Sequence, residues 1–128
     1  MRRTAVAIGL ALGIAVGIAA TMFGIASASA ASPAPGRLFV SAKEFSLVLS
    51  RQTLRPGAAH IQLYDAGEDA HDLVLQRLGG TRQIHIGATR PGDVTELRTV
   101  LRSGTWKLWC SLPGHRAAGM RATLRVRR

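Results

Sequence analysis

The sequence predicts an all-β protein, a Greek-key β-sandwich that follows an N-terminal export signal. From residue 37 onward, short apolar runs alternate with polar residues at a period of two. Glycine and proline separate these runs at short intervals. No segment has the apolar spacing of a convincing helix. Many short strands divided by turns are typical of a sandwich of two antiparallel-rich sheets.

Each expected strand is an alternating run that ends at a turn signal. The turns fall at Arg55-Pro56-Gly57, Leu78-Gly79-Gly80, Arg90-Pro91-Gly92 and Arg102-Ser103-Gly104, because proline presets φ and glycine tolerates a positive φ. The expected strands are residues 38–42, 45–50, 58–64, 72–77, 83–86, 95–101, 105–110 and 121–126.

The strand 105–110 contains the single cysteine of the chain, Cys110. Alternation along it puts Trp106 and Leu108 on the same face as Cys110, and Trp109 on the opposite, outward face. Cys110 is therefore expected among core residues. A lone cysteine also excludes an internal disulfide.

The first thirty residues have the pattern of a secretory signal peptide. Arg2 and Arg3 precede an apolar stretch over residues 5–25, and Ala28-Ser29-Ala30 fits a cleavage site for removal of the signal. An uncleaved membrane anchor through residues 5–25 is the alternative. Both predict a domain outside the cytoplasm: periplasmic, secreted or bound to the cell surface. Residues 31–36 are then a linker and residues 37–128 the domain.

The length of the chain and its net charge exclude some classes of function. A chain of 128 residues leaves room for one domain after the signal, which excludes a multidomain enzyme. Lys and Arg number 17 against 7 Asp and Glu, a net charge of +10, and removing Arg2 and Arg3 leaves 15 − 7 = +8. A solvated basic surface explains this charge, which can also steer an acidic partner or hold the protein near an anionic surface. Export argues against a nucleic-acid partner, and we expect a monomer.

The residues with the strongest chemical signal are Cys110, His115 and Met120, spaced five and five apart. Thiol, imidazole and thioether are soft or borderline metal ligands, and a loop between adjacent strands can bend them around one ion. A fourth ligand must come from elsewhere, and His71 is the best candidate among the remaining histidines. Two imidazoles, a thiolate and a long axial methionine make a blue-copper electron-transfer site. The alternative is a structural cysteine with an exposed histidine and a core methionine.

The run Cys110-Ser-Leu-Pro-Gly-His115, closed by Met120, resembles the copper loop of the cupredoxins, the plastocyanin and azurin group. Residues 54–57, 70–74 and 90–93 resemble further cupredoxin segments, so the resemblance spans about residues 39–126. It implies that His71, Cys110, His115 and Met120 bind one copper ion that cycles between Cu(I) and Cu(II). It also implies an electron carrier, which is not an enzyme.

The sequence departs from many cupredoxins at Asp72, where an asparagine commonly follows the first histidine ligand. A carboxylate there could accept a hydrogen bond from Ser111 and still tie the two ligand loops together. The spacing from His115 to Met120 is one residue longer than in azurins. His60 and His85 are expected to face solvent, since they alternate with polar neighbours on their strands.

The same loop predicts a docking surface for redox proteins. Leu112, Pro113 and Ala117 would form an apolar collar around His115, which suits transient docking. Arg116 at its rim would favour a partner that is acidic at the docking site.

Four classes of function can be compared with these sequence features. The first is an electron shuttle with a single copper ion. The second is a copper storage or delivery protein, which would use exposed ligands that exchange the metal readily. A multicopper enzyme needs more copper ligands and a second domain, and the binuclear site of terminal oxidases needs two bridging cysteines. A metal-free adhesive sandwich would leave the spacing of Cys110, His115 and Met120 as coincidence.

Overall fold

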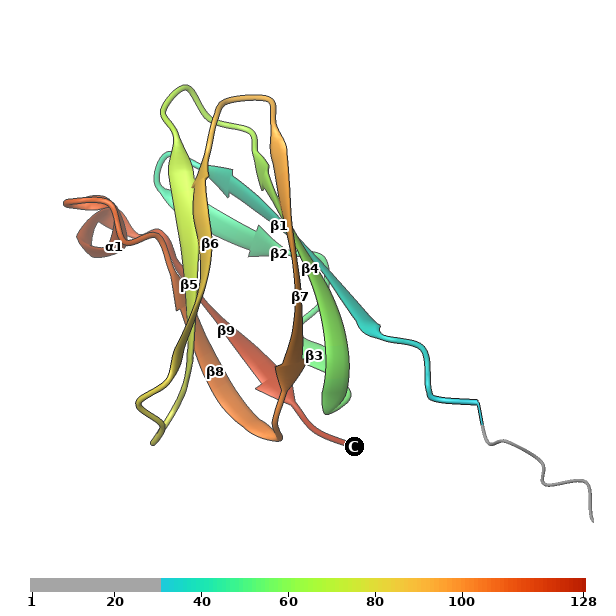
Figure 1. Ribbon diagram of the computed structural model, residues 1–128. Coiled ribbons are helices and arrows are strands. Elements are labelled where there is room, and N and C mark those ends of the chain that lie inside the picture. Colours follow the sequence, from blue (N-terminus) through green and yellow to red (C-terminus); the bar gives the residue numbers. More distant parts are fainter. Residues whose placement is uncertain (1–30) are drawn as a thin grey trace, which may run out of the picture. The chain divides into compact units, whose positions relative to one another are not determined.

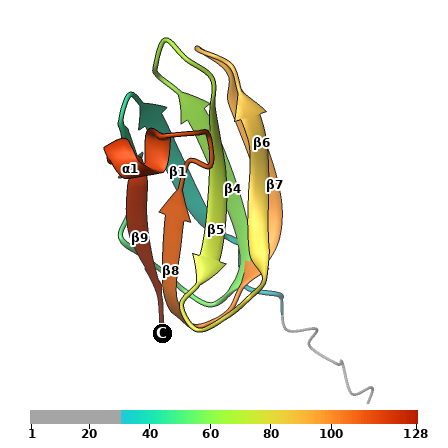
Figure 2. The same cartoon turned by 90° about the vertical axis from the view of Figure 1, so that its left-hand side faces the viewer.

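Residues 31–128, which the computed structural model describes, form two β-sheets packed face to face (Figures 1 and 2). The predicted signal peptide or anchor lies outside the described residues. One sheet has the strand order β2-β1-β4-β7 and the other β3-β9-β8-β5-β6. The elements are β1 Gly36–Lys43, β2 Ser46–Leu49, β3 Thr53–Leu54, β4 Gly57–Asp65, β5 His71–Arg77, β6 Gln83–Thr89, β7 Val94–Leu101, β8 Gly104–Trp109, α1 His115–Ala118 and β9 Arg121–Val126.

The core lies between the sheets because apolar residues alternate along the strands. In β4, Ala59, Ile61 and Leu63 are buried, whereas the intervening His60 and Gln62 are partly exposed. The inward rows of both sheets meet in one apolar cluster. The core is thus built from the alternation that the sequence shows.

All eight predicted strands are present, with ends that shift by a few residues, and the predicted all-β sandwich is confirmed. Two elements were not predicted. The strand β3 is two residues long and pairs in parallel with β9, a partner far along the chain that no local pattern reveals. The helical turn α1 lies inside the loop from β8 to β9. Phe45, expected at the start of a strand, instead lies in the β1–β2 turn and is exposed.

Four connections gather at one end of the sandwich: the β1–β2 turn, the β4–β5 loop, the β6–β7 turn and the β8–β9 loop (Figures 1 and 2). Backbone hydrogen bonds link two of them to neighbouring strand ends, from Ala66 N–H to the Ala42 carbonyl of β1 and from Gly92 N–H to the Asp65 carbonyl of β4. This end, which we call the donor end, carries the candidate metal ligands. Within residues 31–128, no helix is long and apolar enough to cross a bilayer.

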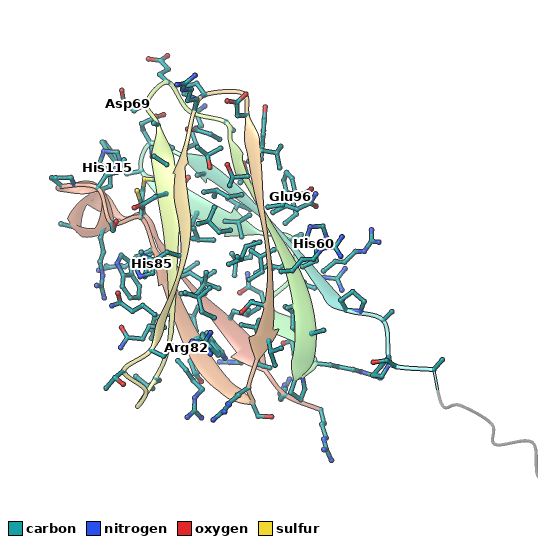
Figure 3. All side chains as sticks on the ribbon, viewed as in Figure 1. His60, Asp69, Arg82, His85, Glu96 and His115 are labelled. Atoms are coloured by element: carbon teal, nitrogen blue, oxygen red, sulfur yellow. The ribbon has the colours of Figure 1, made fainter. Side chains whose placement is uncertain are left out.

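A polar cluster connects β4 and β7 on the outer face of their sheet. Glu96 lies 3.0 Å from His60 Nε2 and accepts a hydrogen bond of 2.5 Å from Gln62 Nε2 (Figure 3). These contacts, first that of Gln62 and then that of His60, lower the pKa of Glu96 below its usual value of 4.5. The ionised carboxylate is therefore the form that the folded state favours.

We expect Glu96→Gln to flatten the acid limb of the stability curve. Because folding lowers the pKa of Glu96, its contribution is present above pH 4.5 and is lost as the pH falls through the folded-state pKa. Urea unfolding of both proteins at several pH values below 5 measures this. Glu68→Gln is the control, since its exposed carboxylate has no hydrogen bond among the described residues. Parallel stability curves for Glu96→Gln and the parent chain would contradict the assignment.

Candidate metal centre

Three metal-ligating side chains meet at the donor end. His71 begins β5, Cys110 directly follows β8 and His115 begins α1. One ligand atom from each lies within 4.8 Å of the others. Cys110 Sγ is 3.7 Å from His115 Nδ1, and the two imidazole rings have centroids 5.2 Å apart. The structure thus brings together three of the four residues that the sequence predicts as ligands.

Met120, the fourth predicted ligand, is tied to two of these residues through its main chain. Its N–H donates to the His115 carbonyl at 3.0 Å, and its carbonyl accepts from Cys110 N–H at 3.1 Å. Its side chain is fully buried and belongs to the same apolar cluster as Cys110. The loop from 110 to 120 therefore closes on itself at its first and last residues.

Two glycines make this closure possible. Gly114 and Gly119 flank α1 with φ of 81° and 127°, values that side chains with a Cβ rarely adopt. A Cβ on Gly119 would also lie 2.9 Å from the Phe45 carbonyl oxygen. Phe45 packs its ring edge-on against His115, with centroids 5.2 Å apart. The β1–β2 turn therefore presses directly on the ligand loop.

Glu44, in the same turn, holds His71 in place. Its Oε1 accepts hydrogen bonds from the backbone N–H groups of Asp69 at 2.8 Å and Glu68 at 2.9 Å, and lies 3.0 Å from His71 Nε2. Hydrogen bonds from the backbone of Asp69, then of Glu44 itself and of Glu68, together with that of the His71 ring, lower the pKa of Glu44 to about 2. Gly67 leaves room for this carboxylate because it has no side chain. A Cβ at that position would overlap the carboxylate of Glu44.

This contact fixes which nitrogen of His71 can bind a metal. An ionised carboxylate only accepts hydrogen bonds, so a neutral His71 ring carries its proton on Nε2 and donates a hydrogen bond from there to Glu44. Nδ1 is then the unprotonated nitrogen, and it is buried with no hydrogen-bond partner among the described residues. A buried, unpartnered nitrogen beside a thiol and a second imidazole is the arrangement that a metal ion would complete.

Asp65 is a further buried acid behind His71. Its Oδ1 accepts from Gly67 N–H at 2.9 Å and lies 3.9 Å from His71 Nε2. Its Oδ2 is buried with no partner among residues 31–128. A second carboxylate on the Nε2 side reinforces the orientation that Glu44 imposes on the ring.

The predicted bond between Asp72 and Ser111 is present. Asp72 Oδ1 accepts from Ser111 N–H at 2.6 Å, and Oδ2 accepts from the Ser111 hydroxyl. Since Asp72 follows His71 and Ser111 follows Cys110, this pair ties together the two segments that carry these donors. Burial raises the pKa of the Cys110 thiol, and the neighbouring Asp72 carboxylate adds to the rise.

The donor set fits a single type 1 copper site. Two imidazoles and one thiol converge, and the backbone of the buried Met120 is hydrogen-bonded to that of Cys110 and of His115. Copper in such sites takes a His₂Cys plane with a long axial methionine. The free Nδ1 of His71 supplies the nitrogen that this plane requires.

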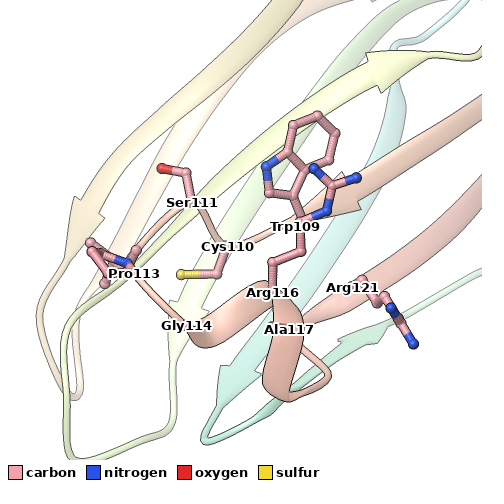
Figure 4. A pocket seen from close by; sticks show the side chains of 9 residues that line it. Trp109, Cys110, Ser111, Pro113, Gly114, Arg116, Ala117 and Arg121 are labelled. Atoms are coloured by element: carbon pink, nitrogen blue, oxygen red, sulfur yellow. The ribbon is translucent and has the colours of Figure 1, made fainter.

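The predicted docking residues line a shallow hollow of about 520 Å³ at the surface (Figure 4). Pro113, Arg116 and Ala117 are exposed and Leu112 is half-buried. His115 lies in the same loop and is half-buried. It is the least buried of the three clustered donors.

Trp109 faces outward as expected from alternation, yet it is buried. The guanidinium of Arg116 covers it, 4.2 Å from the ring centroid (Figure 4). His60 is likewise more enclosed than expected, because it contacts Glu96, whereas His85 is exposed as predicted.

Sequence reasoning missed Glu44, Phe45 and the burial of Asp65. The first two precede His71 by more than twenty residues and touch the site only because the β1–β2 turn folds over it. Asp65 lies where the chain leaves β4 for a loop that also contains Glu68 and Asp69, a place where carboxylates are usually exposed. Its place in the inward row of β4, after Ile61 and Leu63, was the one signal that could have revealed it.

No protein-family model matches the chain, and no curated protein matches it. Among solved structures, the reduced auracyanin of the photosynthetic bacterium Roseiflexus castenholzii is 14% identical, with a TM-score of 0.62 over 75% of this chain and 100% of that chain. Auracyanin A of Chloroflexus aurantiacus, a blue copper protein, is 15% identical, with a TM-score of 0.59 over 73% and 99%. A point mutant of amicyanin in its reduced Cu(I) form is 16% identical, with a TM-score of 0.51 over 75% and 87%. These likenesses confirm the predicted fold.

We expect Glu44→Ala to weaken copper binding by about ten- to a hundredfold, the usual effect of losing the partner of a ligating histidine. Glu44→Gln should keep most of the affinity, because one amide oxygen can accept the three bonds that Oε1 accepts now. Competition with a copper chelator measures both. Glu68→Ala is the matched control. Equal losses in Glu44→Ala and Glu68→Ala would contradict the role of Glu44.

Gly119→Ala should lower the stability of the fold by about 1 kcal/mol or more, because alanine is strained at this φ and its Cβ meets the Phe45 carbonyl. Thermal unfolding measures the loss. Gly87→Ala serves as the control, since its Cβ would meet open space and its φ is not positive. A change at Gly119 no larger than that at Gly87 would show that the loop adapts freely.

Proposed function

We propose that this chain, which has the cupredoxin fold, binds one copper ion through His71, Cys110, His115 and Met120 and passes single electrons between redox proteins outside the cytoplasm. The observation that carries the proposal is the convergence of a buried thiol with two imidazoles, one of which has an unpartnered buried nitrogen. Copper in this setting supplies a one-electron couple between Cu(I) and Cu(II).

The residues around the site suit electron transfer because they resist movement. A carrier works fastest when its ligands hardly move between oxidation states, so the protein must hold a fixed geometry. Glu44 fixes the ring of His71, the Asp72–Ser111 pair fixes the two ligand segments, and Met120 closes the loop. His71 and Cys110 are fully buried and His115 is half-buried, so protein largely encloses the donors.

The surface around His115 supports transient docking. Leu112, Pro113 and Ala117 give it an apolar character, and redox encounters commonly use small interfaces. Arg116 and Arg121 line the same hollow and favour a partner that is acidic at its docking site. Half-buried His115 offers the short route between copper and that partner.

Location outside the cytoplasm is part of the proposal and rests on the sequence of residues 1–30, read as a cleaved signal or as an anchor through residues 5–25. The chain then acts in the periplasm, as a secreted protein or at the cell surface. We infer no enzymatic activity. Copper storage or delivery is the less favoured alternative, because Cys110 and Met120 are fully buried and exposed ligands would exchange metal more readily.

The first experiment is a visible absorption spectrum of the purified chain after addition of Cu(II). An intense blue band from the thiolate-to-copper transition is expected in the parent chain. The Cys110→Ser variant should lack the band, because its hydroxyl cannot supply the thiolate. Absence of the band in folded parent protein would refute the electron-carrier proposal.

Asp72→Asn should raise the reduction potential of the copper centre. The carboxylate of Asp72 lies beside Cys110 and favours the more positive Cu(II), whereas an amide carries no charge. Asparagine keeps a carbonyl oxygen for the Ser111 N–H, so the loops should remain tied. Protein-film voltammetry of the two proteins measures the shift. A potential equal to or below that of the parent chain would disprove the electrostatic argument.

A further inference from the structure

Charge is separated between the two ends of the sandwich. The acidic side chains of the chain occur in three places. One is in the β1–β2 turn, four are in the β4–β5 loop or in the adjoining ends of β4 and β5, and two are in the β6–β7 turn and the first half of β7. All of these positions lie in the half that includes the donor end. The opposite end bears arginines and no acidic side chain. These are Arg51, Arg55, Arg77, Arg82, Arg102, Arg125, Arg127 and Arg128, and we call this surface the basic end.

Strand register shows that these arginines share one end. Thr53 of β3 pairs with Arg125 of β9, and Gly104 of β8 pairs with Val126. The links at 55–56 and 102–103 each join a strand of one sheet to a strand of the other, so both sheets finish there. Figure 3 places Arg82 toward this end and Asp69 at the other.

The basic end contains a cavity, and the arginines that line it form no ion pairs among residues 31–128. A cavity of about 1110 Å³ is lined by Arg51, Arg55, Arg127 and Arg128, together with Pro33 and Leu54. Each of these arginines is exposed. Guanidinium groups without a carboxylate partner are ready to bind phosphate through paired hydrogen bonds.

We propose that the basic end docks onto the anionic phospholipid headgroups of a membrane and thereby turns the donor end toward solution. The arginines come from four connections between strands, from the ends of β5 and β9 and from the segment after β9, so they form a broad surface that suits a plane of phosphates. The chain also enters the domain here, since Gly36 begins β1 opposite Ala59 near the start of β4. Only ten residues, 26–35, separate the apolar stretch 5–25 from Gly36 in the sequence.

A basic surface and an apolar segment in the same chain give two signals for one membrane, which together hold a protein far better than either alone. Docking at this end would leave the surface around His115 open to redox partners. The inference goes beyond the copper proposal and needs no bound metal, so its test is independent of that proposal.

The experiment compares the full chain in nanodiscs of phosphatidylcholine with the full chain in nanodiscs that also contain phosphatidylglycerol. Arginines are modified with phenylglyoxal and quantified by mass spectrometry. At low salt, Arg51, Arg55 and Arg102 should react several-fold more slowly in the anionic discs. Arg90 and Arg116 should react at the same rate in both. High salt should remove the difference, because it screens surface charge.

Two double variants with the same change in net charge provide the control. Arg55→Glu with Arg127→Glu should abolish the lipid-dependent protection of Arg51 and Arg102. Arg90→Glu with Arg98→Glu, away from the basic end, should preserve it. Equal reaction rates in both kinds of disc, or protection centred on Arg116, would overturn the proposal. Stronger protection by double-stranded DNA at the same phosphate concentration would overturn the assignment to lipid.

Discussion

The carboxylate of Glu44 is the contact on which the geometry of the donor end depends. It comes from the turn between β1 and β2, which belong to one sheet. It accepts hydrogen bonds from the β4–β5 loop and from His71, the first residue of β5, which belongs to the other sheet. A single oxygen accepts two backbone N–H groups and the His71 ring. The stacking of the two sheets, the tautomer of His71 and the position of its free nitrogen are thereby coupled.

Different contacts fix the geometry of the loop from Cys110 to Met120. Hydrogen bonds of Met120 close it on itself, and its glycines permit the backbone conformation that this closure needs. Asp72 and Ser111 then connect the loop to β5. The donors are thus held by bonds among their sequence neighbours, and a bound ion would meet a site whose shape is already largely fixed.

Charge is distributed over the fold in a way that separates possible roles. Carboxylates lie in the half with the donors, where several of them position histidines: Glu44 and Asp65 face His71, and Glu96 faces His60. The arginines of the opposite end form no ion pair among residues 31–128 and remain available for an external partner. A protein with a net charge of +10 can therefore present a nearly balanced, partly apolar surface at one end and a strongly cationic one at the other.

The sequence alone determined the sandwich, because alternation and turn residues are local signals that survive without knowledge of the partner strands. It also identified His71, Cys110 and His115, since a thiol and an imidazole at short spacing on one loop restrict each other, and few other histidines were available. It could not reveal β3, whose pairing partner lies at the end of the chain. Glu44 and Phe45 are ordinary surface residues by sequence, and only the packing of the two sheets places them on His71 and His115. The same packing buried Trp109 beneath Arg116 and gathered scattered arginines onto one end, since contacts between distant segments exist only once the sheets are assembled.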